Sequence, residues 1–127
     1  MNWIAVGAIA LALAVSIGAF GAHGLQGRLD NYSMTIYERA VFYHFVHALG
    51  ILLVATLMST GKFSQTGGVW TCRLLLAGIV LFSGSLYALA LTGQRILGAV
   101  TPLGGISFIA AWVVLAATAL RGQPPTP

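Results

Sequence analysis

Three histidines, with the tyrosines and arginines near them, are the side chains of this sequence most suited to chemistry. Arg39, Tyr43 and His47 are spaced four residues apart and so share one side of a helix, with His44 about 60° round from His47. Imidazole exchanges protons near neutral pH and binds metals, while phenol and guanidinium groups bind anions. We therefore predict a polar cluster with these members: His23, Arg39, Tyr43, His44, His47, Tyr87, Arg95 and Thr101.

No catalytic residue is assigned within this cluster. The sequence has no G-x-S-x-G motif, and its one cysteine, Cys72, is predicted to lie across the membrane from the histidines. A single cysteine also excludes an internal disulfide and a cysteine-rich metal site. The pattern His44-x-x-His47 is a weak metal signal, because no carboxylate on the same helical face completes it.

The composition requires a membrane. Of the 127 residues, 58% are hydrophobic and 6% are charged, and the mean hydropathy is +0.92. Soluble domains carry about 25% charged residues, so eight charged side chains could not cover a soluble fold of this length. The basic residues are scattered and form no stripe, which argues against a nucleic-acid partner and fits anchoring at the membrane surface.

Four apolar segments are long enough, or nearly so, to cross the bilayer as helices. We expect an all-α integral membrane four-helix bundle in a single domain, with spans at about 3–22, 39–58, 74–91 and 103–120 and a short tail at 122–127. The polar stretch 59–71 is predicted as a turn. Thr101 is predicted to cap the fourth span, with Pro102 at its first helical position.

Two features are expected to organise the first half of the chain. Small residues recur every four positions in the first span, which predicts close packing against a second helix; they are Ala10, Ala14, Gly18 and Ala22. The connection 26–38 has apolar residues at helical spacing and predicts a short amphipathic segment on the membrane surface between the first two helices. Thr35 and Glu38 would then form a capping box for the second span.

Four spans place both termini on one side of the membrane and all members of the polar cluster in the opposite leaflet. Each side carries three basic residues, so the positive-inside rule gives no decision by count. If Arg39 is drawn into the bundle it does not count, and the termini are then predicted to be cytoplasmic.

The sequence resembles a family of small bacterial membrane proteins called domain of unknown function 423, which includes the animal transmembrane protein 256. The resemblance starts at the stretch GAFGAHGL around His23 and continues through Tyr43 to Leu49, 82–93 and 101–105. It implies four membrane helices and makes His23, Tyr43, His47, Tyr87, Thr101 and Pro102 motif positions, whereas His44 is a feature of this member. It implies no established activity.

Three functions fit these observations. The first is a structural or accessory subunit, or an assembly factor, of a larger membrane complex in the bacterial inner membrane, with other membrane proteins or further copies of the chain as partners. The second is a small-ligand, ion or proton site formed by the His/Tyr/Arg cluster. The third is a haem or metal site built from the three histidines, although no cofactor is expected.

Overall fold

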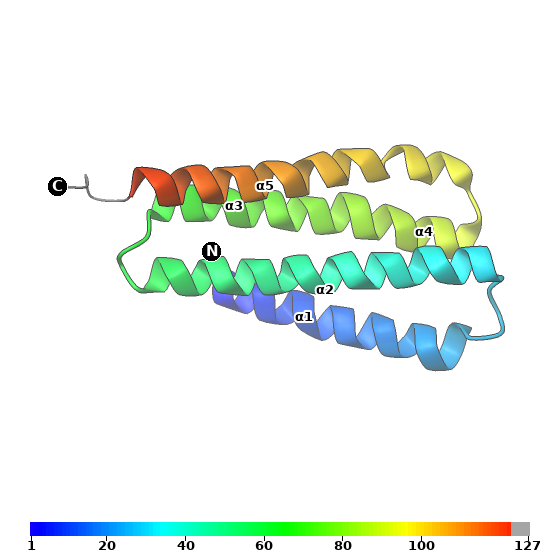
Figure 1. Ribbon diagram of the computed structural model, residues 1–127. Helices are drawn as coiled ribbons and strands as arrows, with labels where there is room; N and C mark the ends of the chain where they lie inside the picture. Colours follow the sequence, from blue (N-terminus) through cyan, green and yellow to red (C-terminus); the bar gives the residue numbers. More distant parts are fainter. Residues whose placement is uncertain (123–127) are drawn as a thin grey trace.

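The computed structural model describes residues 1–122, and four helical spans in this range are long and apolar enough to cross a membrane (Figure 1). The prediction of an all-α membrane protein with four membrane helices is confirmed. Residues 123–127 of the predicted tail lie outside the described residues. The elements, in chain order, are α1 (Trp3–Phe20), the π-helical turn η1 (Gly21–Leu25), α2 (Asn31–Ser59), α3 (Gln65–Gly78), the π-helical turn η2 (Ile79–Ser83), α4 (Gly84–Thr92), the 3-10 helix η3 (Arg95–Ala99) and α5 (Thr101–Arg121).

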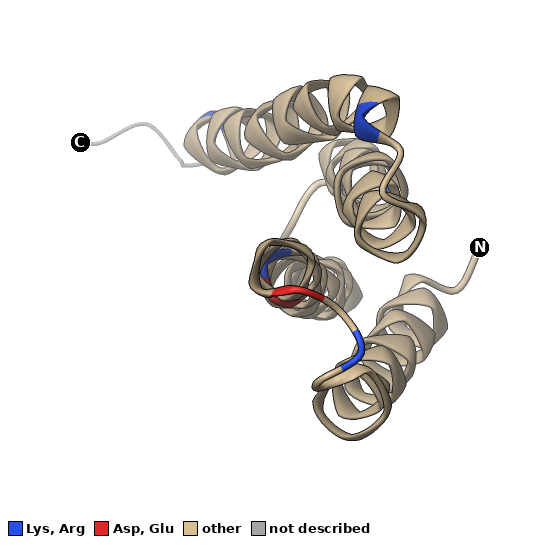
Figure 2. Cartoon of the chain, turned by 90° about the vertical axis from the view of Figure 1, so that its right-hand side faces the viewer, with Lys and Arg blue, Asp and Glu red and all other residues tan. Residues whose placement is uncertain are grey.

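The four spans form an open arrangement in which α2 is central. Helix α2 packs against α1 on one side and against α3, η2 and α4 on the other, while α5 packs mainly against α3 and η2. Viewed along the spans, α1 and α5 lie at opposite ends of the arrangement (Figure 2). In the most apolar stretch of each span, 22% of residues are buried in α1–η1 and 17% in η3–α5, against 44% in each central span. The outer helices therefore present most of their surface to their surroundings.

Helix α2 begins eight residues earlier than predicted. Residues 31–38 are its first two turns, so the predicted amphipathic segment 26–38 reduces to a loop at 26–30. Asp30 caps the helix by accepting a hydrogen bond from the backbone N–H of Ser33 (2.7 Å). The Thr35 hydroxyl instead donates to the carbonyl of Asn31 inside the helix, so the predicted capping box with Glu38 is wrong. The helix starts early because Asp30 is a strong N-cap and because the apolar side chains that follow it are buried against neighbouring helices.

The cap at Asp30 makes the stability of this end of α2 dependent on pH. Hydrogen bonds from Ser33 hold the pKa of the Asp30 carboxyl below its ordinary value of 3.8. A lowered carboxyl pKa stabilises the fold above the unfolded value, and this stabilisation disappears as the pH falls through the folded value. We expect Asp30→Asn, which keeps the capping oxygen, to lose less stability on acidification below about pH 4 than the wild type. Unfolding curves at neutral and acidic pH test this, and equal losses in both proteins would contradict it.

Helix α3 also begins earlier than expected, because two glycines that suggest a turn are packing positions. Ser64 caps α3 by accepting from the backbone N–H of Gly67 (3.3 Å). A Cβ at Gly67 would overlap Thr118 of α5, and a Cβ at Gly68 would overlap Met58 of α2. The predicted turn 59–71 is therefore a loop at 60–64 followed by two turns of helix. The glycines allow α3 to approach both neighbours closely.

The small residues of α1 face α2, with one change to the predicted stripe. Ala10 and Ala14 are buried in the α1–α2 contact, and Gly18 lies against Val41. Ala22 is exposed, and Gly21 takes its place beneath the ring of Tyr37. A strict four-residue repeat drifts round the helix by about 40° at each step, so a straight contact needs alternating steps of three and four residues.

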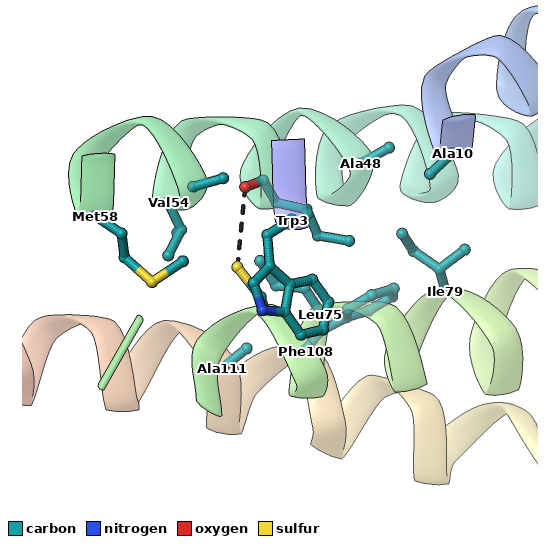
Figure 3. Close-up of a cluster of buried hydrophobic side chains, with 12 residues drawn as sticks. Trp3, Ala10, Ala48, Val54, Met58, Leu75, Ile79, Phe108 and Ala111 are labelled. Atoms are coloured by element: carbon teal, nitrogen blue, oxygen red, sulfur yellow. Dashed lines mark hydrogen bonds between the residues drawn. The ribbon is translucent and has the colours of Figure 1, made fainter. Parts of the chain in front are cut away.

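A hydrophobic core fills the half of the molecule near the start of α1 and the end of α5. Trp3, Val54, Leu75 and Ala111, from four different helices, belong to one buried cluster (Figure 3). Cys72 lies in the same cluster, and its thiol is directed at the carbonyl of Ile51 (3.9 Å). The cysteine is a core side chain.

Candidate functional site

The half of the molecule near the first and third loops contains a set of polar side chains that link helices. We call this set the polar layer. Five of its members belong to the predicted cluster, and Tyr37, Ser83 and Ser85 are additional. The members are Tyr37, Tyr43, His44, His47, Ser83, Ser85, Tyr87 and Thr101. Tyr43 belongs to the layer through its ring, which packs on Phe82 of η2, and through its backbone carbonyl, which accepts from His47.

His44 joins three helices. Its Nδ1 atom forms a hydrogen bond with the hydroxyl of Tyr87 in α4 (2.9 Å), and its ring also faces the backbone carbonyl of Ala10 in α1. The side chain is buried, with 4% of its surface exposed. A neutral imidazole has one donor and one acceptor nitrogen, so it can accept from the phenol and donate towards the carbonyl. His44 is therefore bonded to α4 and lies against α1.

His47, one turn further along α2, lies among aromatic rings. Its Nδ1 atom donates to the carbonyl of Tyr43 (2.7 Å), because a carbonyl can only accept. The imidazole stacks on Phe108 of α5 with ring centroids 3.5 Å apart and lies 5.8 Å from the ring of Trp112. His47 thus packs α2 against α5, and its partners differ from those of His44.

Hydroxyl groups make three further links between helices. The Tyr37 hydroxyl donates to the carbonyl of Ile17 in α1. Ser83 donates to the carbonyl of Ala40 in α2 (2.8 Å). Ser85 of α4 shares a hydrogen bond with Thr101 of α5 (2.7 Å). Thr101 is the first residue of α5 rather than its predicted cap, because its hydroxyl is used for this contact between helices.

Three residues of the polar layer were missing from the predicted cluster, and one of them had a usable signal. Tyr37 precedes His44 by seven residues, which places both on the same face of a helix. Ser83 and Ser85 had no such signal, because a serine in an apolar span often bonds only to its own helix.

His23, Arg39 and Arg95 do not join the polar layer, and all three are exposed. Arg39 was predicted to share a face with His47, but residues four apart drift by about 40° per step, which separates these two by about 80°. Figure 2 shows charged residues at the end of the molecule where α1 connects to α2 and α4 connects to α5. Because Arg39 is exposed, it counts among the basic residues of its side. Each side of the membrane then carries three basic residues, and the positive-inside rule gives no orientation for the termini.

The histidines do not converge on a metal site. Within residues 1–122, no three His, Cys, Asp or Glu side chains are grouped so that they could hold a metal ion. His44 faces Tyr87, His47 stacks on Phe108, and His23 is exposed. The haem or metal hypothesis therefore has no supporting geometry in the described part of the chain.

The His44–Tyr87 bond is expected to stabilise the fold modestly. Removing the hydroxyl in Tyr87→Phe should lower the free energy of unfolding by about 1 kcal/mol, as for other hydrogen bonds between membrane helices. A double-mutant cycle with His44→Leu, measured by denaturation in mixed micelles, isolates the pair. Additive effects of the two substitutions would show that the bond contributes nothing.

Comparison with known proteins identifies the family. The profile of the protein family of unknown function DUF423 matches residues 17–105, about two thirds of the chain. The chain belongs to the DUF423 family. The matched region contains the whole polar layer, from the carbonyl of Ile17 that binds Tyr37 to Thr101, together with Gly104 and Gly105.

Relatives of similar length support this assignment. The UPF0382 membrane protein YwdK of Bacillus subtilis is 48% identical over 94% of the chain and 96% of its own length. UPF0382 membrane proteins of Staphylococcus epidermidis (47% identical; 94% and 95% covered) and Staphylococcus haemolyticus (46%; 89% and 90%) are similar. No solved structure is significantly similar to the chain. The protein is accordingly a membrane protein with membrane-protein relatives in bacteria.

Proposed function

We propose that the protein is an accessory subunit of a larger assembly in the bacterial inner membrane, and that it binds the helices of other membrane proteins through the outward face of α1. One observation carries this proposal. The outward face of α1 is built like a helix-packing surface, whereas the outward face of α5 is built like a surface in contact with lipid.

Small residues line the face of α1 opposite α2. They recur at steps of three and four residues and all are exposed; they are Ala5, Ala8, Ala12, Ser16 and Ala19. Larger side chains flank the stripe, among them Ile9, Leu13 and Phe20. A groove of this kind lets a second backbone approach closely, and small residues at four-residue spacing are typical of packed membrane helices.

Helix α5 is equally uncovered but has a different surface. Its outward residues are mainly large and aliphatic: Leu103, Ile106, Ile109, Val113 and Leu120. Such side chains suit lipid tails, and there is no hydrophobic drive to bury them against another helix within the bilayer. The contrast between the two outer helices favours α1 as the surface for assembly.

The polar layer supports a structural role rather than a ligand site. In the described part of the chain, every fully buried side-chain nitrogen or oxygen has a hydrogen-bond partner. The groups that would make a His/Tyr/Arg site are divided between buried, bonded residues and exposed ones such as His23 and Arg95. The hydrogen bonds of Tyr37, His44, Ser83 and Ser85 join different helices, and such bonds hold membrane helices together.

Photo-crosslinking in native membranes tests the proposal. A photoreactive amino acid at position 12, in the middle of the α1 stripe, should give a product heavier than 13.2 kDa by the mass of a different protein. The same amino acid at position 116, an exposed alanine of α5, should give no protein product. A product at twice the chain mass would indicate self-association instead, and absence of any product at position 12 would reject the surface.

A further inference from the structure

A cavity with a volume of about 690 Å³ lies between the start of α3 and the end of α5. It is at the end of the molecule where the ribbon runs towards the C-terminus in Figure 1, far from the polar layer. Ligand sites typically have volumes of roughly 300–1,000 Å³. The cavity is therefore large enough for part of a lipid molecule.

The outer rim of the cavity is cationic. Lys62, from the loop before α3, and Arg121, at the end of α5, both line it. Ser64 and Thr66 add hydroxyl groups where α3 begins, and the N-terminus of a helix attracts anions. No acidic side chain is among the described lining residues, and the two acidic residues of the chain, Asp30 and Glu38, lie at the other end.

The inner part of the cavity is apolar. Trp70, Leu74 and Val114 line it, and Ala119 borders it on α5. Gly67 contacts Thr118 and brings the two helices together beside it. The guanidinium group of Arg73 lies over the ring of Trp70, with 5.4 Å between the guanidinium carbon and the ring centroid. A tryptophan with neighbouring basic residues is typical of the level of lipid headgroups.

We infer that this cavity binds one anionic phospholipid, with its phosphate at Lys62 and Arg121 and an acyl chain between α3 and α5. The two ends of the cavity match the two ends of such a lipid in charge and polarity. Basic pockets between membrane helices are known binding sites for anionic headgroups. The inference is independent of the α1 surface, because α1 does not line the cavity.

Native mass spectrometry of the purified protein, titrated with dioleoyl-phosphatidylglycerol or dioleoyl-phosphatidylcholine, tests the inference. The wild type should bind phosphatidylglycerol more tightly than phosphatidylcholine. Each basic residue near a membrane surface changes affinity for anionic lipid about fivefold, so Lys62→Gln with Arg121→Gln should weaken phosphatidylglycerol binding roughly 25-fold. The matched control is Arg28→Gln with Arg95→Gln, which removes the same charge at the other end and should leave the affinity unchanged.

A second pair of variants tests the apolar part without changing charge. Ala119→Phe should fill the cavity and abolish the bound lipid, while Ala116→Phe, one turn away on α5 and outside the cavity, should not. This pair decides the matter even if the charge variant fails to fold. Equal affinity for the two lipids, equal loss in both charge variants, or an Ala119→Phe protein that binds like the wild type would overturn the inference. Displacement of the lipid by millimolar inorganic phosphate would also overturn it, because the acyl chain would then contribute nothing.

Discussion

Gly104→Ala is expected to destabilise the protein by about 3 kcal/mol, because it would separate α5 from the π-helical turn η2. A Cβ at Gly104 would overlap the backbone N and Cα atoms of Phe82 and its Cβ. Backbone atoms cannot move aside as a side chain can, so the two helices must part. The separation would also stretch the bond between Ser85 and Thr101 at the same contact.

The neighbouring glycine provides the control. A Cβ at Gly105 would have its nearest neighbour, an atom of the Phe82 ring, at 3.9 Å, which is an ordinary contact. Gly105→Ala should therefore be neutral or stabilise α5 by up to about 1 kcal/mol through helix propensity. The free energy of unfolding of both variants is measured by denaturation in mixed micelles. Equal effects of the two alanines would show that α5 and η2 do not approach as closely as described.

Phe108→Ala is expected to cost about 3–4 kcal/mol of stability. Phe108 is buried, stacks on His47 and lies against Gly78, so its loss leaves a cavity between α2, α3 and α5. It would also release the imidazole of His47 from its aromatic contact. The effect should exceed that of Tyr87→Phe, because packing of a whole ring is lost instead of one hydrogen bond.

The adjacent residue again gives a matched comparison. Ile109 is 66% exposed on the outward face of α5, and Ile109→Ala should change stability by less than about 0.5 kcal/mol. The same unfolding measurement is used for both proteins. If Phe108→Ala were no more destabilising than Ile109→Ala, the aromatic contact around His47 would not hold α5 in place.

The spans could be predicted from the sequence because hydropathy depends on residue type alone. The starts of α2 and α3 could not, because the polar cap at Asp30 and the glycine pair Gly67 and Gly68 resemble loop residues. The start of α3 depends on contacts of these glycines with other helices, and the start of α2 depends on the burial of Ile36 and Tyr37 as well as on the cap at Asp30. The conformational preferences of the individual residues do not predict contacts between helices.

The polar layer was predictable only in part, for a related reason. The sequence predicted that Tyr43, His44 and His47 lie in the first half of the second span on neighbouring helical faces. Only the packing of α4 and α5 decides that His44 meets Tyr87 while His47 meets Phe108. Arg39 has a side chain suited to a polar cluster, but it lies about 80° round α2 from His47 and is exposed. The stripe at Ala12 could not be predicted, because α1 has small residues on two opposite faces and the sequence does not show which face meets α2.

The proposal that the outward face of α1 binds another membrane protein is tested by the mass of the native complex. Extracted in a mild detergent, the wild-type protein should migrate on a native gel in a complex with a second protein. Ala12→Leu should release it from that complex, while Ala116→Leu, the same substitution on the outward face of α5, should leave the complex intact. Migration of the wild type only at the mass of its own monomer or small oligomer, or an unchanged complex in Ala12→Leu, would contradict the claim.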